Sequence, residues 1–284
     1  MPSLTDLSTV RDILSRHGFS FSKALGQNFL INPSVCPRMA AACHPEYEGE
    51  FAGLEIGPGI GVLTKELAQV ATRVIAVELD TRLLPILEET LAEYPNVTVI
   101  NGDAMKLDLA AVLQEHAAGL PVFVCANLPY YITSPLLMRL LESRLPIQAV
   151  TVLVQKEAAV RLCAKPATRD CGAVTFAVRY FAEPEILFSV SKGSFIPAPK
   201  VDSSVIRLRL REQPPCPIAD EALFFRLVHA AFGQRRKTLL NSLTTAGYEK
   251  AQLAQALQTG GLSPTARAEE LSIEQFAALA DALS

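Results

Sequence analysis

The chain has 284 residues, half of them hydrophobic, so it can build a sizeable core and is not expected to be disordered. Its 6 cysteines and 4 histidines form no C-x-x-C pair and no H-E-x-x-H cluster, which argues against a disulfide frame or a metal site. The net charge of −3 gives no overall attraction to nucleic acid, and residues 1–16 lack the apolar centre of a signal peptide. Since no apolar run is long enough to cross a membrane, we expect a cytoplasmic protein without metal.

Alternating strands and helices are predicted over residues 1–211, after a first helix at Leu4–Arg16. Strands are expected at Phe51–Ile56, Arg73–Val77, Val97–Ile100, Val122–Ala126, Ala149–Val154, Glu185–Val190 and Ser203–Leu210. Helices are expected at Val62–Val70, Thr81–Tyr94, Pro135–Leu145, a segment ending at Arg161, and Cys171–Phe181, which is ambiguous and is assigned to helix because a strand-like segment follows it. This alternation indicates an α/β fold with a mostly parallel sheet covered on both faces. The last two strands have no clear helix between them, so one of them is a candidate for an antiparallel strand.

The remaining residues, 212–284, are predicted to form a separate domain that is entirely helical. A proline-rich, linker-like stretch at residues 213–217 precedes it, and Asp220 and Ser272 occupy positions typical of helix N-caps. Helices are expected at Asp220–Phe232, Lys237–Leu243, Glu249–Gln258 and Ile273–Leu283. The sequence therefore predicts an α/β domain at residues 1–211 and a helical domain at residues 212–284.

A glycine-rich loop, Glu55–Gly61, lies between a predicted strand and a predicted helix. Its glycines allow a sharp turn and a close approach of the backbone to a ligand, and Glu78 ends the next strand where a carboxylate can accept from ribose hydroxyls. Both dinucleotides and S-adenosylmethionine are bound by such an arrangement. Asp103, in a Gly-Asp-Ala turn after the third strand, is equally compatible with an adenine amino group and with a helix cap.

The segment Asn127–Tyr130, followed by Tyr131, ends another buried strand. The amide of Asn127 offers both a donor and an acceptor, and the ring of Tyr130 offers a face on which a base can stack. Taken alone, the four residues are equally compatible with a simple turn. Because no residue is placed to assist hydride transfer, the combination favours an amino-group substrate over a dehydrogenase reaction.

Basic residues are concentrated between Arg207 and Asn241, a segment with seven basic and only three acidic residues. Such a patch on an acidic chain can contact phosphates, although a charge run alone more often marks a solvated surface. The basic residues are Arg207, Arg209, Arg211, Arg226, Arg235, Arg236 and Lys237.

Seven ordered segments together resemble the ribosomal RNA adenine dimethyltransferases. They are Lys23–Leu30, Glu55–Gly61, Glu78, Gly102–Ala104, Asn127–Tyr131, Phe195–Ser203 and Phe232–Leu239. The resemblance implies a Rossmann-like class I S-adenosylmethionine-dependent methyltransferase sheet followed by a small C-terminal helical domain that binds rRNA.

The resemblance also implies roles for individual residues. Those that would hold S-adenosylmethionine are Asn28, Leu30, Gly57, Gly59, Glu78 for the ribose, Asp103 for the adenine amino group, and Asn127, which would also touch the target amine. Tyr130 and Phe195 would sandwich the target adenine; Phe195 could instead belong to the core, but Pro197 and Pro199 favour an exposed rigid loop. Phosphate contacts are expected from Arg235, Arg236 and Lys237.

The segments are most similar to those of bacterial members that dimethylate N6 of two adjacent adenosines in a hairpin near the 3′ end of 16S rRNA. The implied partner is 16S rRNA in the immature small ribosomal subunit, and the implied process is ribosome biogenesis. Two alternatives stay open: a 23S rRNA adenine-N6 methylase of the macrolide-resistance type, and a non-catalytic RNA-binding assembly factor that keeps the fold.

Overall fold

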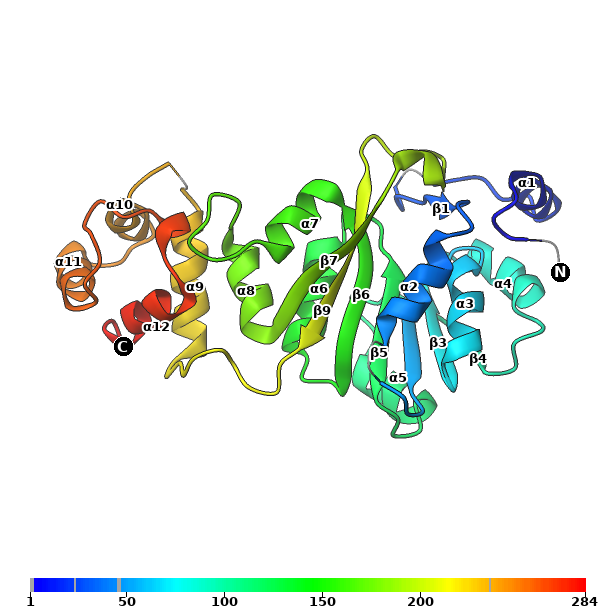
Figure 1. Ribbon diagram of the computed structural model, residues 1–284, viewed down its shortest axis with the longest axis horizontal. Helices are drawn as coiled ribbons and strands as arrows, with labels where there is room; N and C mark the ends of the chain where they lie inside the picture. Colours follow the sequence, from blue (N-terminus) through cyan, green and yellow to red (C-terminus); the bar gives the residue numbers. More distant parts are fainter. Residues whose placement is uncertain (1–2, 23, 45–46, 235) are drawn as a thin grey trace. The chain divides into compact units, whose positions relative to one another are not determined.

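The computed structural model of the protein describes residues 3–22, 24–44, 47–234 and 236–284 (Figure 1). The chain divides into two compact units. The first contains residues 1–159 and 185–210, and the second contains residues 160–184 and 211–284. The chain thus passes between the units three times, and the last passage falls beside the boundary expected at residue 211.

A seven-stranded sheet forms the centre of the α/β architecture, in the order β4-β3-β2-β5-β6-β9-β7. The pairs β2–β3, β3–β4, β2–β5 and β5–β6 are parallel, whereas β9 runs antiparallel to β6. The predicted antiparallel strand is therefore β9. The strands are β2 (Ala52–Ile56), β3 (Arg73–Glu78), β4 (Val97–Asn101), β5 (Val122–Asn127), β6 (Ile147–Gln155), β7 (Ala182–Val190) and β9 (Ser203–Leu210).

The parallel register brings the carboxyl ends of five strands to one edge of the sheet. Ile56 pairs with Val77, and Glu78 pairs with Asn101. The central strands β2 and β5 are almost completely buried, because helices cover both faces and an unbroken apolar run is then favourable. The loops that leave this edge are therefore anchored to a buried core. Open α/β sheets bind ligands at this carboxyl edge.

Helices cover the sheet on both sides: α2 and α3 lie in front of it in Figure 1, and α5 and α6 lie behind it. The helices α2 and α5 were not expected from the sequence. The first unit contains α1 (Leu7–Arg16), α2 (Val35–Cys43), α3 (Val62–Val70), a 3₁₀ turn at Thr81–Leu83, α4 (Leu84–Thr90), α5 (Leu109–His116) and α6 (Thr133–Glu142); α7 (Lys156–Cys163) leads into the second unit.

The second unit is helical around its own apolar core, in which Phe176, Phe224 and Phe276 are fully buried. Both predicted N-caps are confirmed, since Asp220 accepts from Leu223 N and Ser272 accepts from Gln275 N. The ambiguous segment at residues 171–181 is helical from residue 173. The helices are α8 (Ala173–Phe181), α9 (Glu221–Phe232), α10 (Leu239–Thr245), α11 (Lys250–Thr259) and α12 (Ile273–Asp281), with a 3₁₀ turn at Ala268–Glu270.

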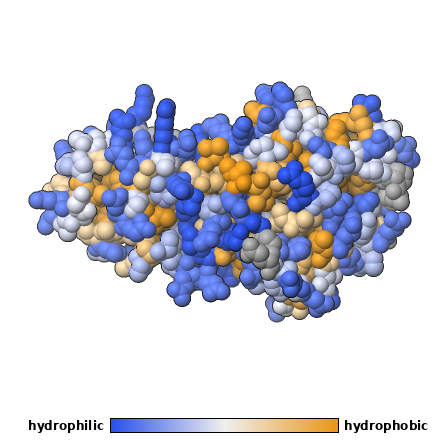
Figure 2. Space-filling view, viewed as in Figure 1, coloured by the Kyte–Doolittle hydropathy of each residue, from blue (hydrophilic) through white to orange (hydrophobic). Residues whose placement is uncertain are grey.

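Hydrophilic residues cover much of the face seen in Figure 2, and apolar residues gather there in separate patches. Across the residues that the structure describes, no helix has the length and apolar character needed to cross a membrane.

Candidate active site

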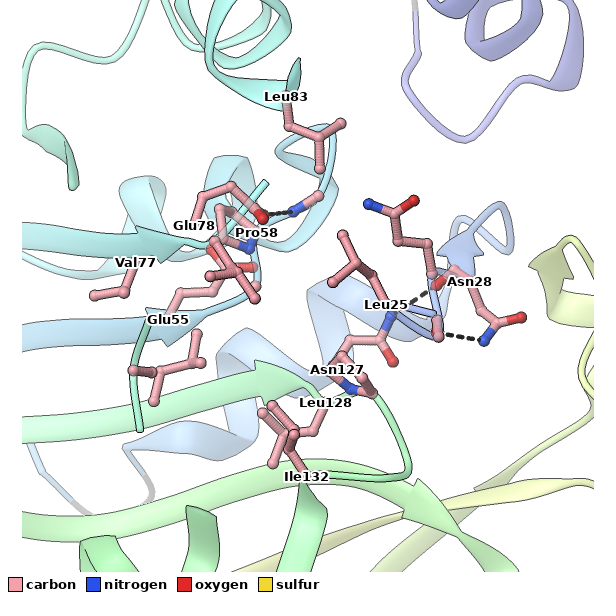
Figure 3. Close-up of a pocket in the computed structure, with 18 of the residues that line it drawn as sticks. Leu25, Asn28, Glu55, Pro58, Val77, Glu78, Leu83, Asn127, Leu128 and Ile132 are labelled. Atoms are coloured by element: carbon pink, nitrogen blue, oxygen red, sulfur yellow. Dashed lines mark hydrogen bonds between the residues drawn. The ribbon is translucent and has the colours of Figure 1, made fainter. Parts of the chain in front are cut away.

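A cavity opens at the carboxyl edge of the sheet (Figure 3). Its walls come from the loops that follow β2, β3, β4 and β5, and from residues 25–30, which precede the sheet in sequence. The structure thereby brings together all the residues predicted to bind the cofactor. They are Asn28, Leu30, Gly57, Gly59, Glu78, Asp103 and Asn127.

The glycine loop after β2 combines a left-handed backbone with free space above it. Gly57 has a φ of 72°, and a Cβ built there meets no heavy atom within 4 Å. Gly59 has a φ of 62°, and a Cβ there would lie 3.1 Å from the Phe29 ring. Side chains are therefore disfavoured at both positions, and Gly57 leaves open a cradle that a ligand can fill.

Glu78 is the last residue of β3 and is only 5% exposed. Its Oε2 accepts from Gly59 N at 3.3 Å and its Oε1 accepts from Asp80 N at 2.7 Å. Burial raises the pKa of the carboxyl group, and the two backbone donors oppose that shift. Because an ionised carboxylate has about four lone-pair sites, two of them are left for a ligand that carries hydroxyl groups.

Glu55, at the start of the glycine loop, is a second buried acid that the sequence did not single out as a site residue. It lines the cavity at 1% exposure, and among the described residues its Oε2 has no hydrogen-bond partner. Burial raises its pKa to about 8, so the side chain is mostly protonated at neutral pH. The available signal was an acid near the end of an otherwise apolar strand.

Asp103 closes the turn after β4 and lines the cavity. Its Oδ1 accepts from Met105 N at 2.9 Å, and Lys106 Nζ lies 3.4 Å from Oδ2. The N-cap of the following helix α5 is Asp108, whose side chain accepts from Ala111 N. The alternative that Asp103 caps this helix is therefore wrong.

Asn127 joins the two ends of the cavity wall. Its Nδ2 donates to Asn28 O at 3.1 Å, and Asn28 Nδ2 donates to Gly26 O at 2.9 Å (Figure 3). The residues are 99 positions apart in sequence, so this contact fixes the segment that precedes the sheet against the end of β5. Among the described residues, the only side-chain hydrogen bond of Asn127 is the one through Nδ2, so its side-chain oxygen is left as an acceptor.

The two tyrosines after Asn127 differ in exposure, although both line the cavity. Tyr130 is half-buried, and its hydroxyl lies 2.8 Å from Ser203 Oγ. Burial raises the pKa of this hydroxyl. Tyr131 is 55% exposed. The structure thus sets an aromatic ring in the cavity wall beside Asn127, and the stacking of a base on Tyr130 stays a prediction.

Phe195 does not line the cavity with the other predicted residues. It is 3% exposed and belongs to the core, because β8 (Phe195–Ile196) pairs with β1 (Phe29–Leu30) and sets Phe195 opposite Leu30. The expected exposed loop is therefore wrong for Phe195 itself. Pro197 is exposed, so the exposed loop expected from the prolines begins after Phe195.

Gln27 is a further residue that the sequence did not single out. Its Nε2 donates to Asp80 Oδ2 at 2.8 Å, and its Oε1 accepts from Ser22 N at 2.9 Å. Asp80 also binds the guanidinium of Arg82, which lowers the pKa of Asp80. Gln27 thus ties the residue before Asn28 to the segment just after Glu78.

Three arginines of the predicted basic patch are held by acids. Arg207 is 7% exposed and donates to Glu185 and to Ala42 O, so it cannot contact a phosphate. Arg209 also contacts Glu185, and Arg211 pairs with Glu183. Arg236 and Lys237 are exposed in the second unit, and Arg235 lies outside the described residues.

All six cysteines are free thiols, and four of them are buried. Cys125, two residues before Asn127, is fully buried in β5. Within the described ranges, no group of three or more His, Cys, Asp or Glu side chains could hold a metal ion.

Comparison with known proteins places this geometry in a family. Residues 18–284 match the family described as ribosomal RNA adenine dimethylase. Two similar curated relatives are both called ribosomal RNA small subunit methyltransferase A. The one from Geobacillus thermodenitrificans is 48% identical over 278 residues, covering 96% of this chain and 94% of the relative. The one from Bacillus mycoides is 47% identical over 288 residues, covering 100% and 98%.

Solved structures resemble the fold over most of its length. A dimethyladenosine transferase from Plasmodium falciparum has a TM-score of 0.71 at 25% identity, covering 88% of this chain and 95% of that one. The 23S rRNA methyltransferase ErmE has a TM-score of 0.68 at 28% identity, covering 90% and 99%. Matches over nearly the whole sequence, at up to 48% identity, show that the chain belongs to the ribosomal RNA adenine dimethylase family.

Proposed function

We propose that this protein dimethylates N6 of two adjacent adenosines in a hairpin near the 3′ end of 16S rRNA, using S-adenosylmethionine, during assembly of the small ribosomal subunit. The names of the bacterial relatives support the small subunit as the substrate. The observation that carries the proposal is the Asn127–Asn28 bond, because it sets an amide between the glycine-loop side of the cavity and Tyr130. We also infer a cytoplasmic location, since the proposed substrate is bacterial ribosomal RNA.

The hydrogen-bonding groups of the cavity fit S-adenosylmethionine. Glu78 has acceptor capacity left for the ribose hydroxyls, and Asp103 lies one strand further along the same edge, where it can accept from the adenine amino group. The open cradle at Gly57, with Asn28 and Leu30 opposite, would take the sugar and methionine side. When bound, this cofactor supplies a methyl group on a sulfonium.

The residues at the base end act chiefly by positioning. The lone pair of adenine N6 is delocalised into the ring, so the amine is a poor nucleophile. Acceptors at Asn127 Oδ1 and at the next backbone carbonyl favour a pyramidal amine whose lone pair points at the methyl group. Transfer is then an in-line displacement, and the neutral leaving group needs no strong general acid.

Tyr130 would stack on an adenine that has left its helix, which costs a few kcal/mol and costs least in unpaired RNA. The Tyr130 ring is held through its hydroxyl by Ser203, so the platform is already oriented. Phe195 could reach the opposite face of the base only if β8 left β1, because it is buried against Leu30.

The second unit would dock structured rRNA through Arg236 and Lys237, together with Arg235. Replacing Arg236 and Lys237 by Ala should weaken RNA binding and reduce the slope of log affinity against log salt by about 0.7–0.9 per lost phosphate contact. Filter binding across a salt series measures this slope. The exposed Lys250 of α11 supplies a matched control, and an unchanged slope in the double variant would remove these residues from the RNA interface.

The deciding experiment supplies labelled S-adenosylmethionine with immature small ribosomal subunits, with large subunits in parallel, and identifies the labelled nucleoside by mass. Dimethyladenosine at adjacent positions in small-subunit RNA is the expected result. Label in large-subunit RNA alone would favour the macrolide-resistance type, to which the likeness to ErmE points. Cofactor binding without transfer to either would favour the assembly-factor alternative.

A further inference from the structure

Arg139 lies on α6, the helix that begins directly after the Asn127–Tyr131 turn. Its guanidinium donates through Nη1 to Met105 O and through Nη2 to Leu107 O. Both carbonyls belong to the turn at residues 102–107, which follows β4 and carries Asp103. One side chain therefore links the helix behind the base end of the cavity to the turn proposed to hold the adenine of the cofactor.

Apart from Gly102 N, which donates to Glu78 O at 2.9 Å, the 102–107 turn is otherwise bonded largely to itself. Asp103 O accepts from Lys106 N and from Leu107 N, both at 2.8 Å, and Asp103 Oδ1 accepts from Met105 N. Met105 and Leu107 lie outside any helix or strand and are partly buried, so their carbonyls have no partner within a regular element. The rigid fork of an arginine can serve two carbonyls at once.

Arg139 has no acidic partner among the described residues, and it is half-buried. Its charge is therefore directed to the two carbonyls of the turn. Without the guanidinium, Met105 and Leu107 would lose their tie to α6. The turn would then be held at its start by the bond from Gly102 N to Glu78 O, and we expect the Asp103 carboxylate to be less firmly placed.

We propose that Arg139 is a positioning residue for adenine recognition: it fixes the 102–107 turn so that Asp103 meets the 6-amino group of the cofactor. This inference rests on the proposed function, because it takes the adenine of S-adenosylmethionine to lie against Asp103. It assigns to Arg139 no contact with the cofactor itself, since Arg139 does not line the cavity.

The second unit offers a matched control. Arg179 on α8 is also half-buried, and it also donates to two backbone carbonyls, Ala164 O at 2.6 Å and Cys163 O at 2.9 Å. It does not line the cavity. Replacing either arginine by Met removes two charged hydrogen bonds and keeps the apolar stem, so both variants should melt at a lower temperature.

The test measures the affinity of the full-length protein for S-adenosylhomocysteine and for its analogue with hydrogen in place of the 6-amino group. The wild-type protein should prefer the amino compound by about tenfold, the equivalent of one well-made hydrogen bond. Asp103→Asn and Arg139→Met should each reduce this preference to about threefold or less, and the double variant should lose little more. Arg179→Met should keep the full preference.

Arg139→Lys, which can serve one carbonyl at a time, should show an intermediate preference; it decides the matter if Arg139→Met does not fold. Full preference in the Arg139 variants, with loss in Asp103→Asn, would overturn the inference and leave the proposed function intact. Full preference in Asp103→Asn would overturn both the adenine assignment and the inference. Equal loss in Arg179→Met would reduce Arg139 to a general stabilising residue and overturn the inference as well.

Discussion

The two ends of the cavity are built in different ways. At the cofactor end, the carboxylates accept from backbone N–H groups: Asp103 from Met105 N in its own turn, and the buried Glu78 from Asp80 N and from Gly59 N of the glycine loop. At the base end, Tyr131 is largely exposed, and Asn127 makes its bond to a segment 99 residues away. The acids of the cofactor end are thus held by several backbone donors, whereas the base end is partly open and is joined to the preceding segment through Asn127.

This difference suits the two ligands. A small cofactor gains affinity from a site that is already ordered, because less entropy is lost on binding. A base presented by a folded RNA must be drawn out of its surroundings, and a partly open wall with an aromatic face admits it. We therefore expect changes at the cofactor end to alter cofactor affinity, and changes at the base end to alter turnover.

Asn127→Ala should give the largest effect. The variant loses the acceptor for the target amine and the bond to Asn28 O, so kcat should fall by about 10²–10³-fold, the range seen when one preorganised polar group is removed from a reacting centre. Single-turnover methylation of small subunits measures the chemical step, and calorimetry measures S-adenosylmethionine affinity separately.

Asn96 provides the control for that variant. Its Nδ2 donates to Ala68 O and Ala71 O, so it is a structural amide in the same unit that does not line the cavity. Asn96→Ala should lower the melting temperature and leave kcat within a few-fold. Near-normal turnover by folded Asn127→Ala would remove the distinction between the two ends of the cavity.

Glu78→Gln should chiefly weaken the binding of the cofactor. An amide in place of the carboxylate turns one acceptor into a donor, which then faces Gly59 N or Asp80 N and frees the loop. S-adenosylmethionine affinity should fall by about 10- to 100-fold, because hydrogen bonds to a charged group are lost. Calorimetry and kcat at saturating cofactor separate the two effects; a fall in kcat with unchanged affinity would contradict the proposed ribose contact.

Tyr130 separates stacking from hydrogen bonding. Tyr130→Ala removes the aromatic face and should lower kcat/KM for the RNA on the order of tenfold, as for the loss of one stacked base. Tyr130→Phe keeps the ring and loses only the contact with Ser203 Oγ, so the change should stay within about threefold. If the two variants were equally impaired, the hydroxyl rather than the ring would be the working group.

Most strands of the sheet could be predicted because they are short apolar runs between turn signals, and β9 could be predicted because apolar and basic residues alternate in its second half. Two helices were missed. The helix α2 contains Pro37 and small alanines, and Ser34 gives it no side-chain cap; it forms where it packs against β5, β6 and β9. The helix α5 did have a signal, since Asp108 caps it. Weak periodicity hides a helix whose stability comes from tertiary packing.

In the site, residues at strand ends could be placed from the sequence because parallel strands finish at one edge. Residues that act by contact with a distant segment could not. Gln27 is 53 positions from Asp80, and Arg139 is 34 positions from Met105. Arg207 shows the opposite error. Its charge was assigned to a phosphate-binding patch from the sequence, but in the fold it pairs with Glu185. Local sequence patterns predict where strands end, but the tertiary fold decides which partners a side chain contacts.

Glu55 is expected to affect stability and its pH dependence, and it tests how firmly the cofactor end is fixed. In the unfolded chain its carboxyl ionises near the ordinary pKa of 4.5, whereas burial keeps it protonated in the folded protein up to about 8. Between these values unfolding releases a proton, so stability falls as the pH rises, by up to about 1.4 kcal/mol per pH unit. Glu55→Gln keeps a neutral side chain of similar size and removes this dependence.

Melting temperatures of wild type and Glu55→Gln, measured from pH 5 to pH 9, should therefore diverge as the pH rises, with the variant increasingly the more stable, and run parallel above about pH 8. Glu142, exposed on α6, supplies a control in which the same substitution should leave the pH profile of the wild type in place. Parallel curves for wild type and Glu55→Gln throughout would mean that Glu55 is ionised in the folded protein. Two negative charges, Glu55 and Glu78, would then line one wall of the cavity, and the cofactor end would need its positively charged ligand to be held in place.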